Sequence, residues 1–117
     1  PFDKKLMEVW EMIIDGKKFV FAKHVAERMM ERRITRNDVY DTLVHGEWMN
    51  CPWGKCNILV RKGIIEVKMY QRSDGSYYVM TVNYTAEFNN HVKEFMDKWK
   101  VWKNKQDVIN CIRYWYY

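Results

Sequence analysis

The sequence predicts an α+β fold in which N-terminal helices pack on an antiparallel meander of three or four strands, followed by C-terminal helices. Two observations predict it. Apolar residues recur at helical spacing before residue 46 and after residue 85, whereas between them they alternate in short runs that turn signals separate. The length of 117 residues suits one domain, over residues 1–117, that buries a core without disulfide staples.

The N-terminal segment is expected to form a helix over residues 4–15. Its apolar residues follow helical spacing, namely Leu6, Val9, Trp10, Ile13 and Ile14. Gly16 and the two lysines after it would end this helix. Residues 19–21 are apolar throughout and are expected to be a brief extended segment that leads into the central helix.

The central helix is expected over residues 22–33, which contain good helix formers and neither glycine nor proline. His24, Arg28 and Arg32 are spaced at intervals of one helical turn and therefore share one stripe. The opposite, buried side would consist of Val25, Ala26, Met29 and Met30. A stripe of imidazole and guanidinium groups suits a phosphate, but a solvated helix face explains the same spacing.

A second helix is expected over residues 36–45. Thr35 and Asp38 have the spacing of a capping box at its start, and Gly46 is expected to end it in the left-handed conformation. The short connection between the two helices raises the alternative of a DNA-reading helix-turn-helix. That motif is normally followed by more helices, whereas a strand region follows here.

Three strands are expected over residues 57–61, 64–72 and 77–84, because turn residues at 62–63 and 73–75 separate them. A short edge strand is also expected at residues 48–49. These runs would form the meander, with one face covered and the other open.

Alternation along these strands assigns residues to the two faces of the sheet. In the middle strand, Glu66, Lys68 and Tyr70 would share the face opposite the apolar residues. In the last strand, one face would carry Tyr78, Met80, Val82 and Tyr84. Thr81 would then point to the other face, so that only one of Thr81 and Tyr84 looks into a given cleft unless a bulge intervenes.

The C-terminal helices are expected over about residues 86–116. Thr85 is a candidate N-cap, and an apolar stripe follows it, consisting of Phe88, Val92, Phe95, Trp99 and Trp102. Asp107 is a candidate cap for a last helix. Lysines on this region either form a solvated face or track phosphates.

The composition favours a polyanionic partner, because the net charge is +5 and six Trp, eight Tyr and five Phe supply surfaces on which bases stack. Three cysteines argue against a disulfide framework. The pair Cys51 and Cys56 lacks the second ligand pair of a zinc site, so free thiols are expected and no metal or cofactor is predicted. No apolar run is long enough for a membrane span, and no signal peptide is visible.

Part of this pattern resembles a known family. The elements that carry the resemblance are His24-x3-Arg28-Met29-x2-Arg32, Ile34-Thr35, Asp38-Val39, Leu43-x2-Gly46 and Thr81-Val82-Asn83-Tyr84. Over residues 19–84 the chain resembles the RelE/ParE-like toxins, within the barnase–EndoU–colicin–RelE group of ribonucleases. The family pattern has glycine where this chain has Arg33, and Asn83 interrupts its Thr-Val-aromatic element.

The resemblance implies metal-independent cleavage of RNA, in which the 2′-hydroxyl attacks the adjacent phosphate and leaves a cyclic phosphate. It assigns proton transfer to His24 and phosphate binding to Arg28 and Arg32. The strands would complete the site with Lys68, Tyr70 and either Thr81 or Tyr84, of which we favour Thr81 because Tyr77 and Asn83 would share its face. In the loop, Trp53 and Lys55 either hold a base or form a hydrophobic plug.

The resemblance also implies partners and a place of action. The RNA would be cut in the cytoplasm, with tRNA as one candidate substrate, and an acidic immunity or antitoxin protein would neutralise the toxin. The start at Pro1 suits an effector domain that is delivered as part of a larger protein, and a boundary set by cloning explains it equally well. Two alternatives stay open: a non-catalytic module that binds RNA or the ribosome, and an interaction domain that docks through its aromatic residues 114–117.

Overall fold

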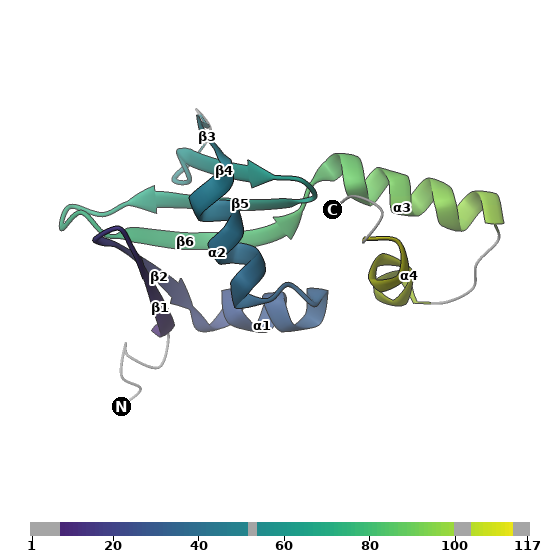
Figure 1. Cartoon of the computed structure of the whole chain (residues 1–117), viewed down its shortest axis with the longest axis horizontal. Helices are drawn as coiled ribbons and strands as arrows, with labels where there is room; N and C mark the ends of the chain where they lie inside the picture. The colour runs from purple at the N-terminus through teal and green to yellow at the C-terminus, as the bar shows by residue number, and fades with distance from the viewer. Residues whose placement is uncertain (1–7, 52–53, 100–103, 114–117) are drawn as a thin grey trace.

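The computed structural model describes residues 8–51, 54–99 and 104–113 of the chain. They form a six-stranded sheet and four helices, in an α+β arrangement (Figure 1). In chain order the elements are β1 (Glu8–Ile14), β2 (Lys17–Ala22), α1 (Lys23–Arg32), α2 (Arg36–His45), β3 (Glu47–Asn50), β4 (Ile58–Lys62), β5 (Ile65–Gln71), β6 (Tyr77–Tyr84), α3 (Ala86–Trp99) and α4 (Lys105–Ile112). The predicted fold class is confirmed in its coarse form, but two strands rather than helices come first.

The sheet has the order β1-β2-β6-β5-β4-β3. Strands β3 to β6 form the expected antiparallel meander, and the predicted edge strand at residues 48–49 is part of β3. The hairpin of β1 and β2 extends this meander to six strands, because β2 pairs with β6 in parallel over Phe19–Phe21 and Tyr77–Val79. The predicted number of strands, three or four, was therefore too low.

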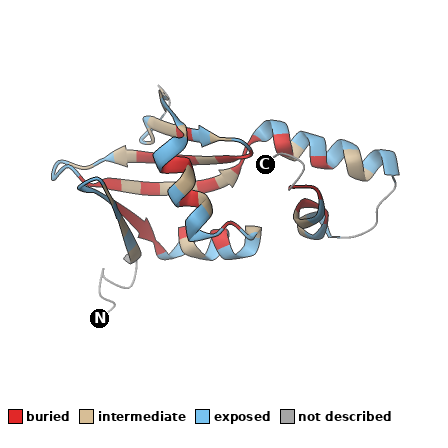
Figure 2. Ribbon diagram, viewed as in Figure 1, coloured by how far each residue is buried: buried red, intermediate tan, exposed pale blue. Residues whose placement is uncertain are grey.

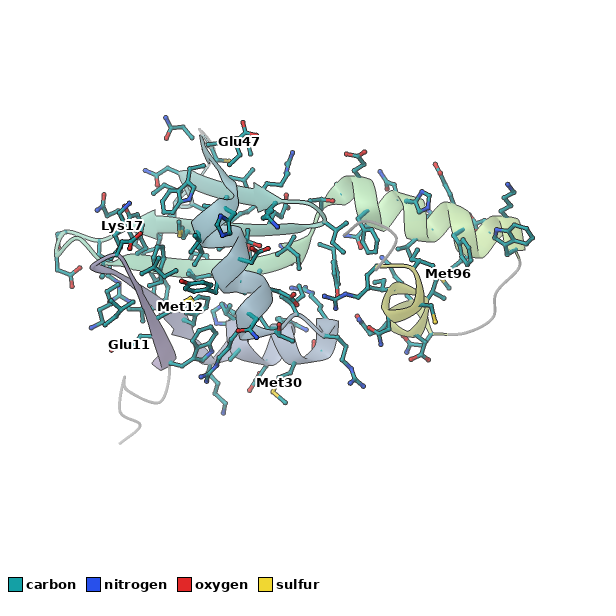
Figure 3. The ribbon with its side chains drawn as sticks, in the orientation of Figure 1. Glu11, Met12, Lys17, Met30, Glu47 and Met96 are labelled. Atoms are coloured by element: carbon teal, nitrogen blue, oxygen red, sulfur yellow. The ribbon has the colours of Figure 1, made fainter. Side chains whose placement is uncertain are left out.

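The predicted helix over residues 4–15 is wrong where the structure describes it, because residues 8–14 form strand β1; residues 4–7 lie outside the described part. The side chains of β1 alternate: Trp10 and Met12 pack against the core, whereas Ile13 is 66% exposed. Figure 3 labels Glu11 and Met12 on opposite sides of this strand. Trp10 stacks on Phe21 of β2, with ring centroids 3.8 Å apart.

The missed signal was the dipeptide Asp15-Gly16, which joins β1 to β2. Both residues have positive φ, 50° for Asp15 and 77° for Gly16, as a two-residue type I′ hairpin turn requires. Ile14 and Lys17 are register partners on either side of it. The glycine therefore turns a hairpin rather than ending a helix.

Helices α1 and α2 cover one face of the sheet. Helix α2 packs on β4 and β5, and α1 runs along β6 and the end of β2 (Figure 1). Figure 2 shows buried residues alternating with less buried ones along β5 and β6. The core between sheet and helices includes Phe19, Phe21, Val25, Met29, Val39, Leu43, Val60, Val67, Met69, Val79 and Val82. Met30, predicted to be buried, is 78% exposed and points away from the sheet (Figure 3).

The structures of the helix ends agree in part with the predictions. Thr35 and Asp38 form the expected capping box, in which the Thr35 hydroxyl accepts from Asp38 N and the Asp38 carboxylate accepts from Thr35 N. Gly46 is not left-handed, since its φ is −78°. A Cβ there would lie 2.2 Å from the carbonyl oxygen of Thr42, so close backbone packing explains the glycine.

Arg33 is the residue that ends α1 in the left-handed conformation, with φ of 58°. Ile34 N donates to Met29 O and Arg33 N donates to Met30 O, which is the pattern of a Schellman motif. The backbone at Arg33 therefore favours a residue without a Cβ.

Helices α3 and α4 extend beyond the sheet and pack on each other (Figure 1). Helix α3 follows β6 directly, and the Thr85 hydroxyl accepts from Phe88 N at 3.2 Å, as predicted for its N-cap. The N-cap of α4 is Asn104, not Asp107, because the Asn104 side chain accepts from Gln106 N. The predicted stripe residue Trp102 and the aromatic residues 114–117 lie outside the described residues.

Strands β5 and β6 contain a bulge that decides which residues share a face. Lys68 pairs with Thr81, but Met69 pairs with Val79, so Met80 has no register partner. Core-facing residues lie on both sides of the bulge: Tyr77 and Val79 before it, and Val82 and Tyr84 after it. The predicted common face of Tyr78, Met80, Val82 and Tyr84 is therefore wrong, as is the shared face of Tyr77 and Thr81.

Candidate functional site

The face of the sheet opposite α1 and α2 collects polar side chains. Lys68 and Tyr70 of β5 lie there, as predicted, with Tyr78 and Thr81 of β6 opposite them in register. All four are half-buried, and none of the described helices packs over them. We call this side the uncovered face of the sheet.

Thr81 is the most unusual residue on this face. Its hydroxyl oxygen is buried and makes no hydrogen bond to any residue that the structure describes. A buried polar atom without a partner costs about 1–3 kcal/mol. Such atoms are rare in native proteins and call for an explanation, of which a ligand group is one. Lys68 is the register partner of Thr81, so the two side chains start side by side on this face.

Arg32 is brought to the same region from the last turn of α1. Its Nη1 donates to the carbonyl oxygen of Val82 at 2.9 Å. That carbonyl accepts a side chain because the β2–β6 pairing ends at Val79 and leaves the later part of β6 without a neighbouring strand on that side. One hydrogen bond leaves further N–H groups of the guanidinium for a phosphate. Arg32 is therefore held against β6 at the residue that follows Thr81.

His24 and Arg28 lie along the same stripe of α1. Both are exposed, and Arg28 pairs with Glu31 at 3.1 Å. Helix α1 begins directly after β2, which pairs with β6 as far as Val79, and its last residue, Arg32, reaches Val82. His24 is about 12 Å from Arg32 along the helix axis. No hydrogen bond or ion pair in the described structure joins His24 to Lys68 or Thr81.

Tyr84 points to the opposite face from Thr81, as the sequence predicted. It is 4% exposed, and its hydroxyl donates to the backbone carbonyl of Arg32. The Nη1 of Arg113 donates to the same hydroxyl at 3.2 Å and to the carbonyl of Arg33 at 2.6 Å. These contacts satisfy carbonyls that the end of a helix otherwise leaves unpaired. Tyr84 therefore holds the end of α1 rather than facing the open side of the sheet.

Arg113 and Gln106 were not predicted to bear on the site. Arg113 is 6% exposed, and its Nη2 donates to the Asp38 carboxylate at 3.1 Å. Gln106 Nε2 donates to the carbonyl of Arg32 at 2.9 Å. Both come from the end of the chain, far in sequence from α1, and no local pattern marks them.

The loop before β4 borders the uncovered face. Burial raises the pKa of the Cys56 thiol above its ordinary value of 9.0, and the positive charge of Lys68 opposes this. Lys55 in the same loop is exposed, and Trp53 lies outside the described residues. The ring of Tyr70 lies 5.5 Å from that of Tyr78, so this face carries an aromatic pair beside its cation.

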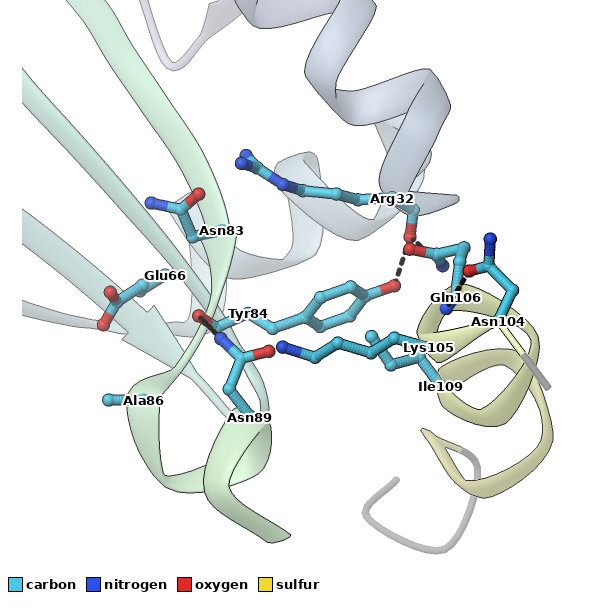
Figure 4. Close-up of a pocket in the computed structure, with 10 residues that line it drawn as sticks. All are labelled: Arg32, Glu66, Asn83, Tyr84, Ala86, Asn89, Asn104, Lys105, Gln106 and Ile109. Atoms are coloured by element: carbon cyan, nitrogen blue, oxygen red, sulfur yellow. Dashed lines mark hydrogen bonds between the residues drawn. The ribbon is translucent and has the colours of Figure 1, made fainter. Parts of the chain in front are cut away.

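A pocket of about 550 Å³ adjoins the candidate site on the far side of Arg32. Its lining comes from the ends of α1 and β6 and from the first turns of α3 and α4 (Figure 4). The polar side chains in its wall include Arg32, Glu66, Asn83, Asn89, Lys105 and Gln106. Arg32 thus belongs to both the uncovered face and the pocket.

Comparisons with known proteins give no assignment: no family model, curated protein or solved structure matches this chain. Within residues 8–51, 54–99 and 104–113, no three His, Cys, Asp or Glu side chains come together as metal ligands. Among the described helices, none combines the length and the apolar character needed to cross a membrane.

Proposed function

We propose that this domain is a metal-independent endoribonuclease toxin that cuts RNA, with tRNA as a candidate substrate. The proposal is carried by the unpartnered hydroxyl of Thr81, which has Lys68 as its register partner and is followed in β6 by Val82, whose carbonyl accepts from Arg32. Two cations and a hydroxyl donor suit the charge-rich transition state of phosphodiester cleavage. The sequence resemblance to ribonuclease toxins points to the same chemistry.

The reaction needs two proton transfers. A base removes the proton of the 2′-hydroxyl, its oxygen bonds to phosphorus, and the bond from phosphorus to the 5′-oxygen breaks as an acid protonates that oxygen. His24 is the candidate for one transfer, because imidazole changes protonation near neutral pH. Lys68 is the candidate for the other. Arg32 and the Thr81 hydroxyl would bind the non-bridging oxygens, and Arg28 would hold a neighbouring phosphate.

A non-catalytic module that binds RNA or the ribosome is the second candidate. The observation that favours it is the exposure of His24, which in the described part of the chain makes no hydrogen bond or ion pair with Lys68 or Thr81. On this view the same cations bind phosphates, and the paired rings of Tyr70 and Tyr78 stack on bases. Binding would then not depend on the imidazole.

The deciding experiment incubates the purified chain with total RNA and with tRNA in EDTA. A His24→Ala variant is compared with a His45→Ala variant, which removes an exposed imidazole at the end of α2. Cleavage that leaves cyclic-phosphate ends, persists in the chelator and disappears only in His24→Ala supports the ribonuclease. RNA that is bound and stays intact supports the binding module.

We also propose that an acidic immunity or antitoxin protein binds this domain, because the net charge of +5 favours such a partner. The toxin would act in the cytoplasm of the affected cell. Inducing the chain inside bacteria should stop growth, and His24→Ala should restore it. Growth arrest by both forms would mean that toxicity does not come from cleavage.

A further inference from the structure

The pocket beside Arg32 has no role in the cleavage step described above. It joins the uncovered face because the Arg32 side chain reaches from the end of α1 toward Asn83 (Figure 4). Its volume of about 550 Å³ is in the range of small-molecule sites. An RNA strand whose phosphate lies at Arg32 would therefore present its neighbouring nucleotide to this pocket.

Side-chain amides dominate the chemistry of the pocket wall. The Asn83 side chain makes no hydrogen bond to another described residue. The Asn89 amide donates one N–H to the carbonyl of Tyr84 at 3.4 Å. Each amide offers a donor beside an acceptor, which is the arrangement that reads the edge of a base. Figure 4 shows the Lys105 side chain extending from α4 toward the Asn89 amide.

The charged groups in the wall suit a base that is flanked by phosphates. Glu66 lies in the wall; its carboxylate pairs with Arg61 at 3.4 Å and has further lone pairs that can accept hydrogen bonds from amino groups. Arg32 and Lys105 are positioned on other parts of the wall, where the phosphates that flank the base would lie. Neutral amides with one carboxylate match a base that carries an exocyclic amino group.

We propose that this pocket binds one base of the RNA strand, adjacent to the phosphate at Arg32, and that it selects adenine, cytosine or guanine over uracil. This rests on the proposed ribonuclease function for its role in cleavage. Asn83 and Asn89 read the base edge, and Glu66 accepts from its exocyclic amino group. The pocket thereby gives cleavage a base preference at one position beside the cut.

The test uses two measurements on the whole chain. The first is binding of the four nucleoside 3′-monophosphates, followed by NMR. The second is sequencing of the ends that cleavage of a random-sequence RNA produces. The variants are Asn83→Ala and Glu66→Gln, and the matched control is Asn90→Ala, which removes an exposed amide of α3 that does not line this pocket.

The unmodified chain should bind uridine monophosphate about tenfold more weakly than the other nucleotides and should rarely cut beside uracil at the selected position. Asn83→Ala should weaken binding, and Glu66→Gln should remove the discrimination against uracil, with Asn90→Ala unchanged. Selective binding without cleavage supports the pocket and overturns the ribonuclease. If the chain cleaves RNA but shows no base preference and binds no nucleotide, the proposed base-binding role of the pocket is wrong and the ribonuclease proposal stands. Equal effects of Asn83→Ala and Asn90→Ala would also overturn the role of the pocket.

Discussion

The hydroxyl of Tyr84 donates a hydrogen bond to the backbone carbonyl of Arg32 and so joins the end of β6 to the last residue of α1. The side chain of Arg32 donates in turn to the carbonyl of Val82 on the same strand. Arg32 is therefore fixed to β6 at both its main chain and its side chain. A guanidinium held in this way loses little rotamer freedom when a phosphate binds.

Tyr84→Phe should lower the free energy of unfolding by about 1–2 kcal/mol, because it removes a buried hydroxyl from contacts with Arg32 and Arg113. Urea denaturation measures this change. RNA cleavage per folded molecule should stay within about fivefold, since Gln106 still donates to the Arg32 carbonyl. Unchanged stability with abolished cleavage would instead assign the Tyr84 hydroxyl to catalysis.

Thr81→Val should affect activity without harming stability. The valine has the shape of threonine and removes a buried hydroxyl that has no hydrogen bond in the described structure, so the unfolding free energy should stay the same or rise by up to about 1 kcal/mol. The rate of RNA cleavage should fall by about 10- to 100-fold if that hydroxyl binds the transition state. Thermal unfolding and cleavage kinetics measure the two effects.

The matched control for this change is Thr42→Val. The Thr42 hydroxyl is also buried, but it donates to the carbonyl of Asp38 at 2.8 Å. This substitution should lower the unfolding free energy by about 1 kcal/mol and leave cleavage unchanged. If Thr81→Val destabilised the protein as much as Thr42→Val, the Thr81 hydroxyl would have a structural partner.

Arg33→Gly should stabilise the protein by about 0.5–1 kcal/mol, because Arg33 adopts the left-handed conformation at the end of α1. The contact from Arg113 survives, since it uses the main-chain carbonyl of Arg33. Urea denaturation checks the prediction. The control Arg28→Gly, inside the helix and paired with Glu31, should instead cost about 1 kcal/mol. A loss of stability in both variants would contradict the conformational argument.

The Cys56 thiol should show a pH dependence that reports on Lys68. Burial raises the pKa of Cys56 above 9.0, and the Lys68 charge lowers it by a smaller amount. Alkylation by iodoacetamide at pH 8, resolved by mass spectrometry, should therefore be slower for Cys56 in the folded chain than after unfolding. Lys68→Met should raise the pKa further and slow the reaction again. A faster reaction in Lys68→Met would show that Lys68 does not lie beside the thiol.

The same shift predicts how stability changes in base. The thiol is favoured in its neutral form when the chain is folded, so its contribution to stability is complete below the unfolded pKa near 9.0. This contribution is lost as the pH rises through the higher pKa that the thiol has in the folded chain. Urea midpoints should therefore fall less steeply above pH 9 in Cys56→Ala than in the unmodified chain. An identical slope would argue against the shift.

Much of the central part of the fold was predictable because its signals are local. The capping box at Thr35, the alternation along β5 and the turn before β6 each depend on a few neighbouring residues. Strand β1 was not predicted because a short run rich in apolar residues fits the spacing of a helix and the alternation of a strand equally well. The pairing of Trp10 with Phe21 decides between them, and it is a tertiary contact.

The sequence nominates candidate site residues, but it does not predict their geometry. Stripe spacing on α1 identified Arg32, while its hydrogen bond to Val82 depends on where the β2–β6 pairing ends. The bulge at Met80 reverses the faces along β6 and has no signature in this sequence. Gln106 and the other contacts from α4 join segments that are distant in sequence, which no local pattern reveals.

The parallel pairing of β2 with β6 also has a consequence for biosynthesis. The partner that covers Phe19 and Phe21 in the sheet is made only when the ribosome has reached Tyr77–Val79. Until then the β1–β2 hairpin has an open edge, whereas β3, β4 and β5 pair with close neighbours in the chain. We therefore expect completion of the sheet, rather than formation of its meander, to limit the folding rate, and the nascent hairpin to be the segment most exposed to aggregation or chaperone binding.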